Sequence, residues 1–326
     1  MEFKENIGGR LVKRIFELKT SDIENLKKND LVEIIKTSEG RTVMSETIIS
    51  YTPYIREVSN LELAASFGAD MITLNTFNFN KPFIFGIDDR INLSSSLEKM
   101  MELIKESIEK NINNKDYIKD VKRLTGRLIG VNLEPVPEGS TYEVGYRLNR
   151  ENLEKVKFYG FDYIVITGNP NTGVTQQTIC DGIKLAKEIL GDETLIIAGK
   201  MHGAGSGNIS DDEAIKEFVL SGADVILFPA PGTAPGFDLD VCKKIAKTVH
   251  DNNALVMTTI GTSQEGSSTS IIEQIALNSK MIGADIQHIG DCGTFGVALP
   301  ENIMALSKTI RGIRHTYAKM ARSIIR

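Results

Sequence analysis

Acidic and amide side chains accompany three short apolar runs of the sequence. Glu46 lies within RTVMSETIIS, Asn132 and Glu134 lie in RLIGVNLEP, and Asp291 follows the last apolar run. Carboxylate and amide oxygens are the ligands that Mg²⁺ prefers, whereas carboxylates with separated pKa values serve as general acid and base. We therefore predict that Glu46, Glu134 and Asp291 hold Mg²⁺ or move protons. The alternatives are an ion pair of Glu46 with a neighbouring lysine and a solvated loop beginning at Glu134.

Lys200 and His202 follow another apolar run, in the string AGKMHG. A desolvated lysine has a lowered pKa and forms a Schiff base with carbonyl substrates. The same lysine is equally suited to bind an anionic substrate or to neutralise Glu134. A histidine at this place is a natural general acid or base, and a hydrogen bond to a loop carbonyl is the alternative. We predict that Lys200 and His202 belong to the catalytic group.

A repeated phrase positions these side chains. Gly-Ala-Asp or Gly-Phe-Asp, followed by an apolar run, occurs at residues 68–72, 160–164, 222–226 and 283–286. Glycine is the natural residue just beyond a helix end. The last three copies are about 60 residues apart, and one βα unit of a barrel takes about 30 residues. The phrase therefore predicts the start of every second strand.

The remaining strands are expected between the copies, because buried parallel strands are short apolar runs. Eight strands alternating with eight helices predict a single (βα)8 TIM barrel over residues 41–326, with extra helices in residues 1–40 that cover its N-terminal end. The strands between the copies are expected at 41–50, 127–135, 194–199 and 254–260, and the helices at 61–67, 97–109, 150–159, 175–190, 211–220, 239–252, 270–282 and 301–325.

In such a barrel the active site lies where the strands end. Barrels that take phosphorylated substrates hold the phosphate on the loops after strands seven and eight, where glycine permits close approach. Glycine-rich loops also occur because tight turns need them. Thr76, Thr167, Thr259 and His288 also stand at strand ends, and Cys292 is expected to be a small buried residue. The expected ligands of the substrate are Asn75, Asn132, Asn169, Gly261, Thr262, Gly290 and Gly293.

Two long loops carry aromatic residues. Residues 77–86 contain four phenylalanines, and we expect this segment to form either a lid over the site or an oligomer contact. Residues 134–147 contain Tyr142 and Tyr146.

The composition excludes several classes of protein. A net charge of −5 argues against a nucleic-acid partner. No apolar run approaches the ~20 residues of a membrane span. The three cysteines have no CxxC spacing, and no organic cofactor is indicated. We expect a cytoplasmic homo-oligomer whose partner is a small anionic metabolite.

Four strings, GNPNTGVT, AGKMHG, FPAPGTAPG and HIGDCGTFGVALPENIMALSKTIRGIRHTYAKMARS, resemble a bacterial family of uncharacterised TIM-barrel proteins. Its members are often labelled phosphoenolpyruvate phosphonomutase-like and are sometimes mislabelled haloacid dehalogenase-like hydrolases. The resemblance implies Mg²⁺, acidic ligands on strand ends and substrates similar to oxaloacetate or pyruvate. This sequence reads Asn132-Leu133-Glu134 in place of the superfamily's paired-Asp motif, and it lacks the Lys-Lys-Cys-Gly loop.

These observations predict a lyase or isomerase of a small phosphorylated or carboxylated metabolite, assisted by Mg²⁺. The alternatives are a Schiff-base aldolase that uses Lys200 and a non-catalytic protein that binds a phosphorylated sugar.

Overall fold

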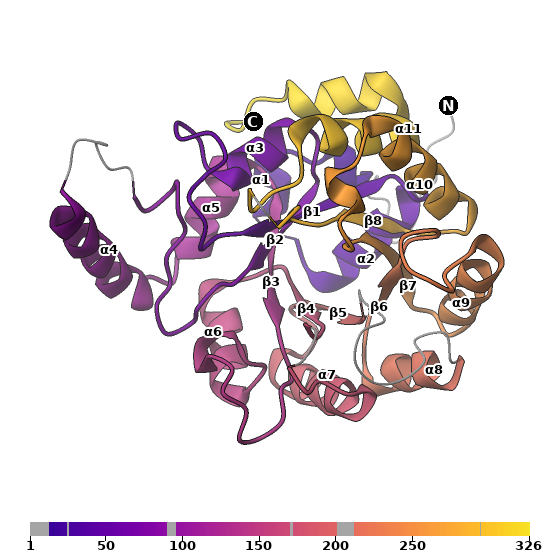
Figure 1. Ribbon diagram of the computed structural model, residues 1–326, viewed down its shortest axis with the longest axis horizontal. Coiled ribbons are helices and arrows are strands. Elements are labelled where there is room, and N and C mark those ends of the chain that lie inside the picture. The colour runs from indigo at the N-terminus through magenta and orange to yellow at the C-terminus, as the bar shows by residue number, and fades with distance from the viewer. Residues whose placement is uncertain (1–12, 25, 90–95, 170–171, 201–211, 294) are drawn as a thin grey trace.

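The computed structural model describes residues 13–326 except 25, 90–95, 170–171, 201–211 and 294 (Figure 1). Eight parallel strands form a closed barrel in chain order, and β8 closes onto β1 with Thr42 opposite Ile286. The predicted (βα)8 barrel is confirmed. The strands are β1 (Thr42–Ile48), β2 (Met71–Asn75), β3 (Leu128–Leu133), β4 (Tyr163–Ile166), β5 (Leu195–Gly199), β6 (Val225–Pro229), β7 (Leu255–Ile260) and β8 (Ile286–Ile289).

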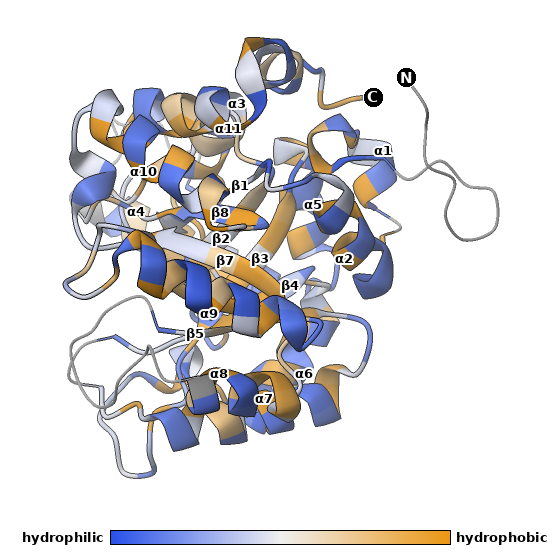
Figure 2. Cartoon of the chain, turned by 90° about the vertical axis from the view of Figure 1, so that its right-hand side faces the viewer, coloured by the Kyte–Doolittle hydropathy of each residue, from blue (hydrophilic) through white to orange (hydrophobic). Residues whose placement is uncertain are grey.

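Amphipathic helices surround the barrel and cover the outward-facing apolar side chains of its strands. Figure 2 shows hydrophobic residues gathered in the strands and hydrophilic residues on the outer side of helices such as α9. These helices are α3 (Asn60–Ser66), α5 (Tyr117–Thr125), α6 (Arg150–Tyr159), α7 (Gln176–Leu190), α8 (Asp212–Ser221), α9 (Leu239–Asp251), α10 (Thr269–Met281) and α11 (Pro300–Met320). Short 3-10 turns occur at η2 (Val144–Tyr146) and η3 (Gln264–Gly266).

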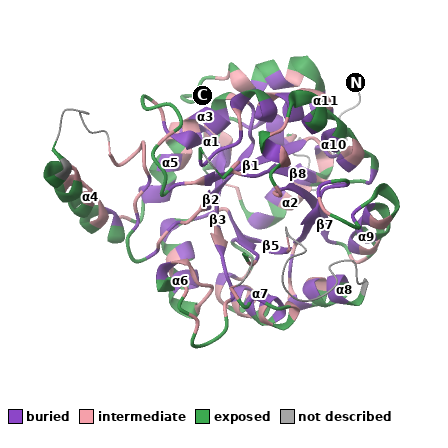
Figure 3. Cartoon of the chain, in the orientation of Figure 1, coloured by how far each residue is buried: buried purple, intermediate pink, exposed green. Residues whose placement is uncertain are grey.

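The connection between β2 and β3 differs from the prediction. The helix expected at 97–109 exists as α4 (Leu97–Ile112), but it protrudes from the barrel (Figure 1). The barrel position is taken by α5, which was not predicted and which packs between α3 and α6 on β3. The physical reason is burial: α5 buries Tyr117, Ile118 and Val121, whereas Met101 of α4 is 63% exposed. Figure 3 shows this contrast in colour.

The N-terminal segment closes one end of the barrel, as predicted. It forms η1 (Ile15–Glu17), α1 (Thr20–Ile23) and α2 (Lys28–Thr37). Phe16 and Ile35 are buried in the same apolar cluster as the barrel-interior residues Met44 and Leu195. The active-site end is therefore the opposite one.

Each aspartate of the repeated phrase holds two strands together at this closed end. Its carboxylate accepts a hydrogen bond from the backbone N–H of the preceding strand, at 2.8–3.0 Å. Each carboxylate also pairs with a basic side chain from elsewhere in the fold. The pairs of aspartate and N–H donor are Asp70 with Val43, Asp162 with Ile129, Asp224 with Ile196 and Asp285 with Val256.

The first aromatic residues of the segment 77–86 form neither the lid nor the oligomer contact that was expected from the sequence. Phe77 and Phe79 are fully buried and pack edge-on against Phe161. They belong to the main core between the strands and the outer helices.

Within the described residues, no helix combines the length and apolar character needed to cross a membrane.

Candidate active site

The two-residue period of the strands decides which side chains reach the barrel interior. Met44, Met71 and Leu128 face inward at the closed end. Counting on by even steps brings Glu46, Asn75 and Asn132 to the inside at the carboxyl ends of the same strands. The functional side chains therefore continue the inward-facing rows of the core.

A tyrosine occupies the barrel interior directly beneath these residues. The Tyr163 hydroxyl lies 3.0 Å from Thr73 Oγ1. Tyr163 stands opposite Gly130 in the pairing of β3 and β4, and a Cβ at Gly130 would lie 2.2 Å from the tyrosine ring. Gly130 therefore makes the room for this side chain, which is fully buried.

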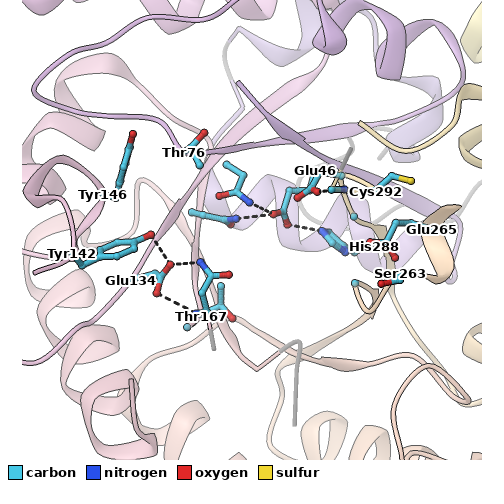
Figure 4. A pocket seen from close by; sticks show the side chains of 18 residues that line it. Glu46, Thr76, Glu134, Tyr142, Tyr146, Thr167, Ser263, Glu265, His288 and Cys292 are labelled. Atoms are coloured by element: carbon cyan, nitrogen blue, oxygen red, sulfur yellow. Dashed lines mark hydrogen bonds and ion pairs between the residues drawn. The ribbon is translucent and has the colours of Figure 1, made fainter. Parts of the chain in front are cut away.

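A pocket of about 270 Å³ opens at the carboxyl ends of the strands. It brings together nine of the predicted site residues: Glu46, Asn75, Asn132, Glu134, Asn169, Gly261, Gly290, Asp291 and Gly293. Thr76, Thr167 and His288, which the sequence placed at strand ends, also line the pocket. The structure adds Tyr142, Tyr146, Gly168, Ser263, Glu265 and Cys292. Cys292 was expected to be buried, but it is only partly buried. Figure 4 shows side chains from both groups around the pocket.

The Glu46 carboxylate is the centre of the first hydrogen-bonded group. Its Oε1 accepts hydrogen bonds from Asn75 Nδ2 at 2.7 Å and Asn132 Nδ2 at 3.1 Å, and its Oε2 lies 2.9 Å from His288 Nε2. Glu46 is 5% exposed and His288 is 1% exposed. Both amides must donate here, since a carboxylate has only acceptor oxygens. With Nε2 donating to Glu46, the neutral imidazole carries its lone pair on Nδ1, which has no hydrogen-bond partner among the described residues.

A second group forms around Glu134, at another part of the wall (Figure 4). Glu134 Oε1 accepts hydrogen bonds from the Tyr142 hydroxyl at 2.6 Å and from the Asn169 amide, and Oε2 accepts one from the Asn169 backbone N–H at 3.1 Å. Burial raises the pKa of Tyr142, and the bond to Glu134 raises it further. Tyr142 therefore remains a hydrogen-bond donor at neutral pH.

Asp291 and Glu265 form an acidic region beside the loops after β7 and β8. Burial raises the pKa of Asp291, and the nearby charge of Glu46 adds to this effect. Burial also raises the pKa of Glu265, to which the charge of Asp291 contributes. Both carboxyls therefore hold their protons at a higher pH than an exposed carboxyl does.

Three residues of the lining have left-handed backbone conformations that are uncommon outside glycine. Thr76, Ser263 and Cys292 have φ values of 63°, 80° and 63°. Such conformations persist where surrounding structure imposes them, and they cluster at functional sites. They follow β2, β7 and β8, at the rim of the pocket.

Two predicted residues of the described part of the chain, Lys200 and Thr262, are not among those that line the pocket. Lys200 follows directly after the end of β5. Burial lowers the pKa of Lys200. The Thr262 hydroxyl donates instead to the Thr233 carbonyl at 2.6 Å. His202 lies outside the described residues.

The predicted magnesium ligands do not converge on one point. Among the described residues, no three side chains of His, Cys, Asp or Glu are grouped so that they would share a metal ion. Glu46 and Glu134 each spend both carboxylate oxygens on protein groups. The donor set of Glu46, Glu134 and Asp291 therefore does not fit Mg²⁺, which demands near-octahedral oxygen ligands.

The predicted phosphate loops also have their N–H groups engaged. The Gly290 N–H donates to the Ile260 carbonyl at 2.8 Å, and the Gly293 N–H donates to Asp291 Oδ1 at 2.7 Å. The glycines line the pocket as expected, but these two donors bond to the protein itself.

Sequence reasoning missed Glu265 entirely and assigned no role to His288. Glu265 lies in the 3-10 turn after β7, five residues beyond the strand end, where strand periodicity gives no signal. His288 had a signal: it shares the inward row of Ile286, and the pairing with Met44 of β1 brings it beside Glu46.

Comparisons with other proteins give one similarity in sequence and several in fold. A geranylgeranylglyceryl phosphate synthase from Ignicoccus hospitalis is 30% identical over 93 residues, which are 28% of this chain and 33% of that protein. The chain thus matches about a third of that relative's length. A thiamine phosphate pyrophosphorylase from Pyrococcus furiosus has a TM-score of 0.45 with 14% identity over 83% of this chain and 96% of that chain.

Another solved structure is a 2,3-dimethylmalate lyase, a member of the PEP mutase/isocitrate lyase superfamily. It has a TM-score of 0.45 with 13% identity over 81% of both chains. The family comparison covers far more of the sequence, since one family model matches residues 16–326. The chain belongs to the family described as domain of unknown function DUF7916.

Proposed function

We propose that this chain is an enzyme that transfers protons to and from a small metabolite, as a lyase or isomerase does. The observation that carries the proposal is the buried pair of Glu46 and His288 in the wall of the pocket, 2.9 Å apart. A carboxylate bonded to an imidazole fixes its tautomer and stabilises the imidazolium that forms when the ring accepts a proton. Asn75 and Asn132 hold the carboxylate in place from its other oxygen.

Asp291 supplies the complementary acid. Its raised pKa keeps a proton available nearer to neutral pH. An acid and a base whose environments differ within one pocket are the arrangement that enzymes use for general acid–base catalysis. We assign His288 with Glu46 as the base and Asp291 as the acid. The pocket volume of about 270 Å³ limits the substrate to a small metabolite.

The test is a proton-exchange screen in D₂O, read by ¹H NMR. The panel contains small carboxylated, phosphorylated and amino metabolites, each with and without Mg²⁺. His288→Gln and Glu46→Gln are expected to lower the rate of the reaction found by about 10²-fold or more, because a positioned acid or base contributes roughly 10²–10⁴-fold. His250→Gln is the matched control, since His250 pairs with Asp285 at the closed end of the barrel.

Turnover in the wild type that both pocket variants retain would contradict the proposal. A compound that binds tightly but is neither exchanged nor converted would favour the alternative of a non-catalytic binding protein.

A further inference from the structure

We propose that the ligand of this pocket presents a protonated amine to Glu265. The inference concerns the pocket of the proposed function and names the class of molecule that it takes. Figure 4 shows Glu265 beside His288 and Ser263 at the wall of the pocket.

The charge of the lining is one-sided. It contains the four carboxyl groups of Glu46, Glu134, Glu265 and Asp291, and within the described part of the chain it contains no lysine or arginine. A pocket lined by one sign of charge attracts ligands of the opposite sign and disfavours those of the same sign. A phosphate or carboxylate placed among these groups would meet like charge.

Three of the four carboxyl groups already accept hydrogen bonds from the protein, and among them Asp291 accepts one from the Gly293 N–H at 2.7 Å. Glu46 accepts from two amides and faces His288, and Glu134 accepts from Tyr142 and Asn169. Glu265 differs, because its Oε2 is buried and has no hydrogen-bond partner in the described structure, although the residue is only 6% exposed. A buried acceptor without a partner destabilises the protein, so a donor from the ligand would remove this cost.

Two backbone N–H groups near Glu265 already donate to acceptors of the protein. Glu265 Oε1 lies 3.4 Å from where a Cβ of Gly290 would be, which places its carboxyl against the start of the loop after β8. The Gly290 and Gly293 N–H groups donate to Ile260 and Asp291. Asn132 adds a second buried acceptor, Oδ1, without a partner. An ammonium group has three donors and can bond to the Glu265 and Asn132 oxygens that lack a partner among the described residues.

The experiment compares probes that differ in one functional group. Isothermal titration calorimetry of the full chain at neutral pH measures 1,4-diaminobutane, 4-aminobutan-1-ol, 1,4-butanediol, inorganic phosphate and Mg²⁺ separately. Both amines are expected to bind at least about tenfold more tightly than the diol, as one charge-assisted hydrogen bond is worth roughly 1.4 kcal/mol or more. Glu265→Gln is expected to weaken the amines by about tenfold, and Glu273→Gln, on the exposed face of α10, to leave them unchanged.

Several results would overturn the inference. These are equal binding of the diol and the amines, binding of phosphate in preference to the amines, binding of Mg²⁺ alone with loss in Glu265→Gln, and failure of both amines to bind. A folded Glu265→Gln protein, verified by an unchanged circular dichroism spectrum, that keeps full amine affinity would do the same. The proposed function is judged separately, because the calorimetry needs no turnover and the proton-exchange screen needs no amine.

Discussion

Carboxyl groups in this pocket differ in what surrounds them, and that difference separates their chemistry. Glu46 and Glu134 are surrounded by hydrogen-bond donors, whereas Asp291 and Glu265 lie where burial raises their pKa values. Residue type alone does not distinguish these cases, since all four are ordinary acids in the sequence. Their roles follow from the neighbours that the barrel brings to them.

Asp291 should cost the folded protein stability once it ionises. A carboxyl whose pKa is raised by folding contributes stability that is present below the unfolded pKa, near 3.9, and lost as the pH rises through the folded pKa. Asp291→Asn is therefore expected to raise the melting temperature at about pH 7 by roughly 2 °C, with the difference shrinking as the pH falls toward the unfolded pKa. Thermal denaturation followed by circular dichroism at several pH values measures this.

Asn retains the oxygen that accepts the Gly293 N–H, so the substitution removes the charge with little change in shape. The exposed Asp251→Asn is the control for loss of one surface charge. A melting temperature of Asp291→Asn that falls below that of the wild type at neutral pH would contradict the expectation.

At the scale of elements, the aspartates at the starts of the even-numbered strands stabilise the pairing of neighbouring strands. Asp162 joins β3 to β4 by accepting the Ile129 N–H at 2.8 Å, and it pairs with Lys122 at 2.8 Å. Removing one partner of a buried hydrogen bond leaves the other unsatisfied. The aspartates of the repeated phrase thus stabilise the closed end of the barrel and do not line the pocket.

Asp162→Ala is expected to lower the free energy of unfolding by about 1–3 kcal/mol, because it leaves the Ile129 N–H without its acceptor and removes the ion pair with Lys122. Urea denaturation gives this quantity. Asp251→Ala removes an exposed carboxylate paired with Lys247 and is expected to cost under about 1 kcal/mol. Equal losses of stability in the two variants would mean that the contacts of Asp162 contribute no more than an exposed ion pair does.

For the whole molecule, the N-terminal segment acts as the closed end of the barrel. Phe16 is 1% exposed, packs against His315 of α11 and lies within 4.8 Å of the Arg14 guanidinium. The Phe16 side chain therefore connects the N-terminal segment, which we call the plug, to the last helix. This contact joins the first and last elements of the fold at the closed end of the barrel. The pocket lies at the other end.

Phe16→Ala is expected to destabilise the fold by about 3–5 kcal/mol, the usual cost of emptying a buried phenylalanine site. Phe158→Ala is the matched control, since Phe158 is 44% exposed, and it should cost no more than about 0.5 kcal/mol. Chemical denaturation of both variants measures the difference. Similar values for the two would show that the plug is not part of the cooperative fold.

The barrel and much of the pocket could be predicted from the sequence. The repeated Gly-x-Asp phrase and the apolar runs between its copies have the period of a βα unit, and the barrel pairs its strands in chain order. Glu46, Asn132, Glu134 and Asp291 were predictable because the carboxyl ends of barrel strands meet at one face. The pattern within single segments is enough to predict the strands and helices, because the same βα unit repeats along the chain.

Which of these groups lie together could not be predicted from the sequence and is known from the folded structure. It placed His288 beside Glu46, 242 residues away in sequence, and Glu265 against the loop that holds Asp291. It seated α5 on β3 while α4 protrudes, although both helices are amphipathic. The physical reason is that pairing, burial and pKa depend on distances through space between strands, which the periodicity within a single segment does not contain.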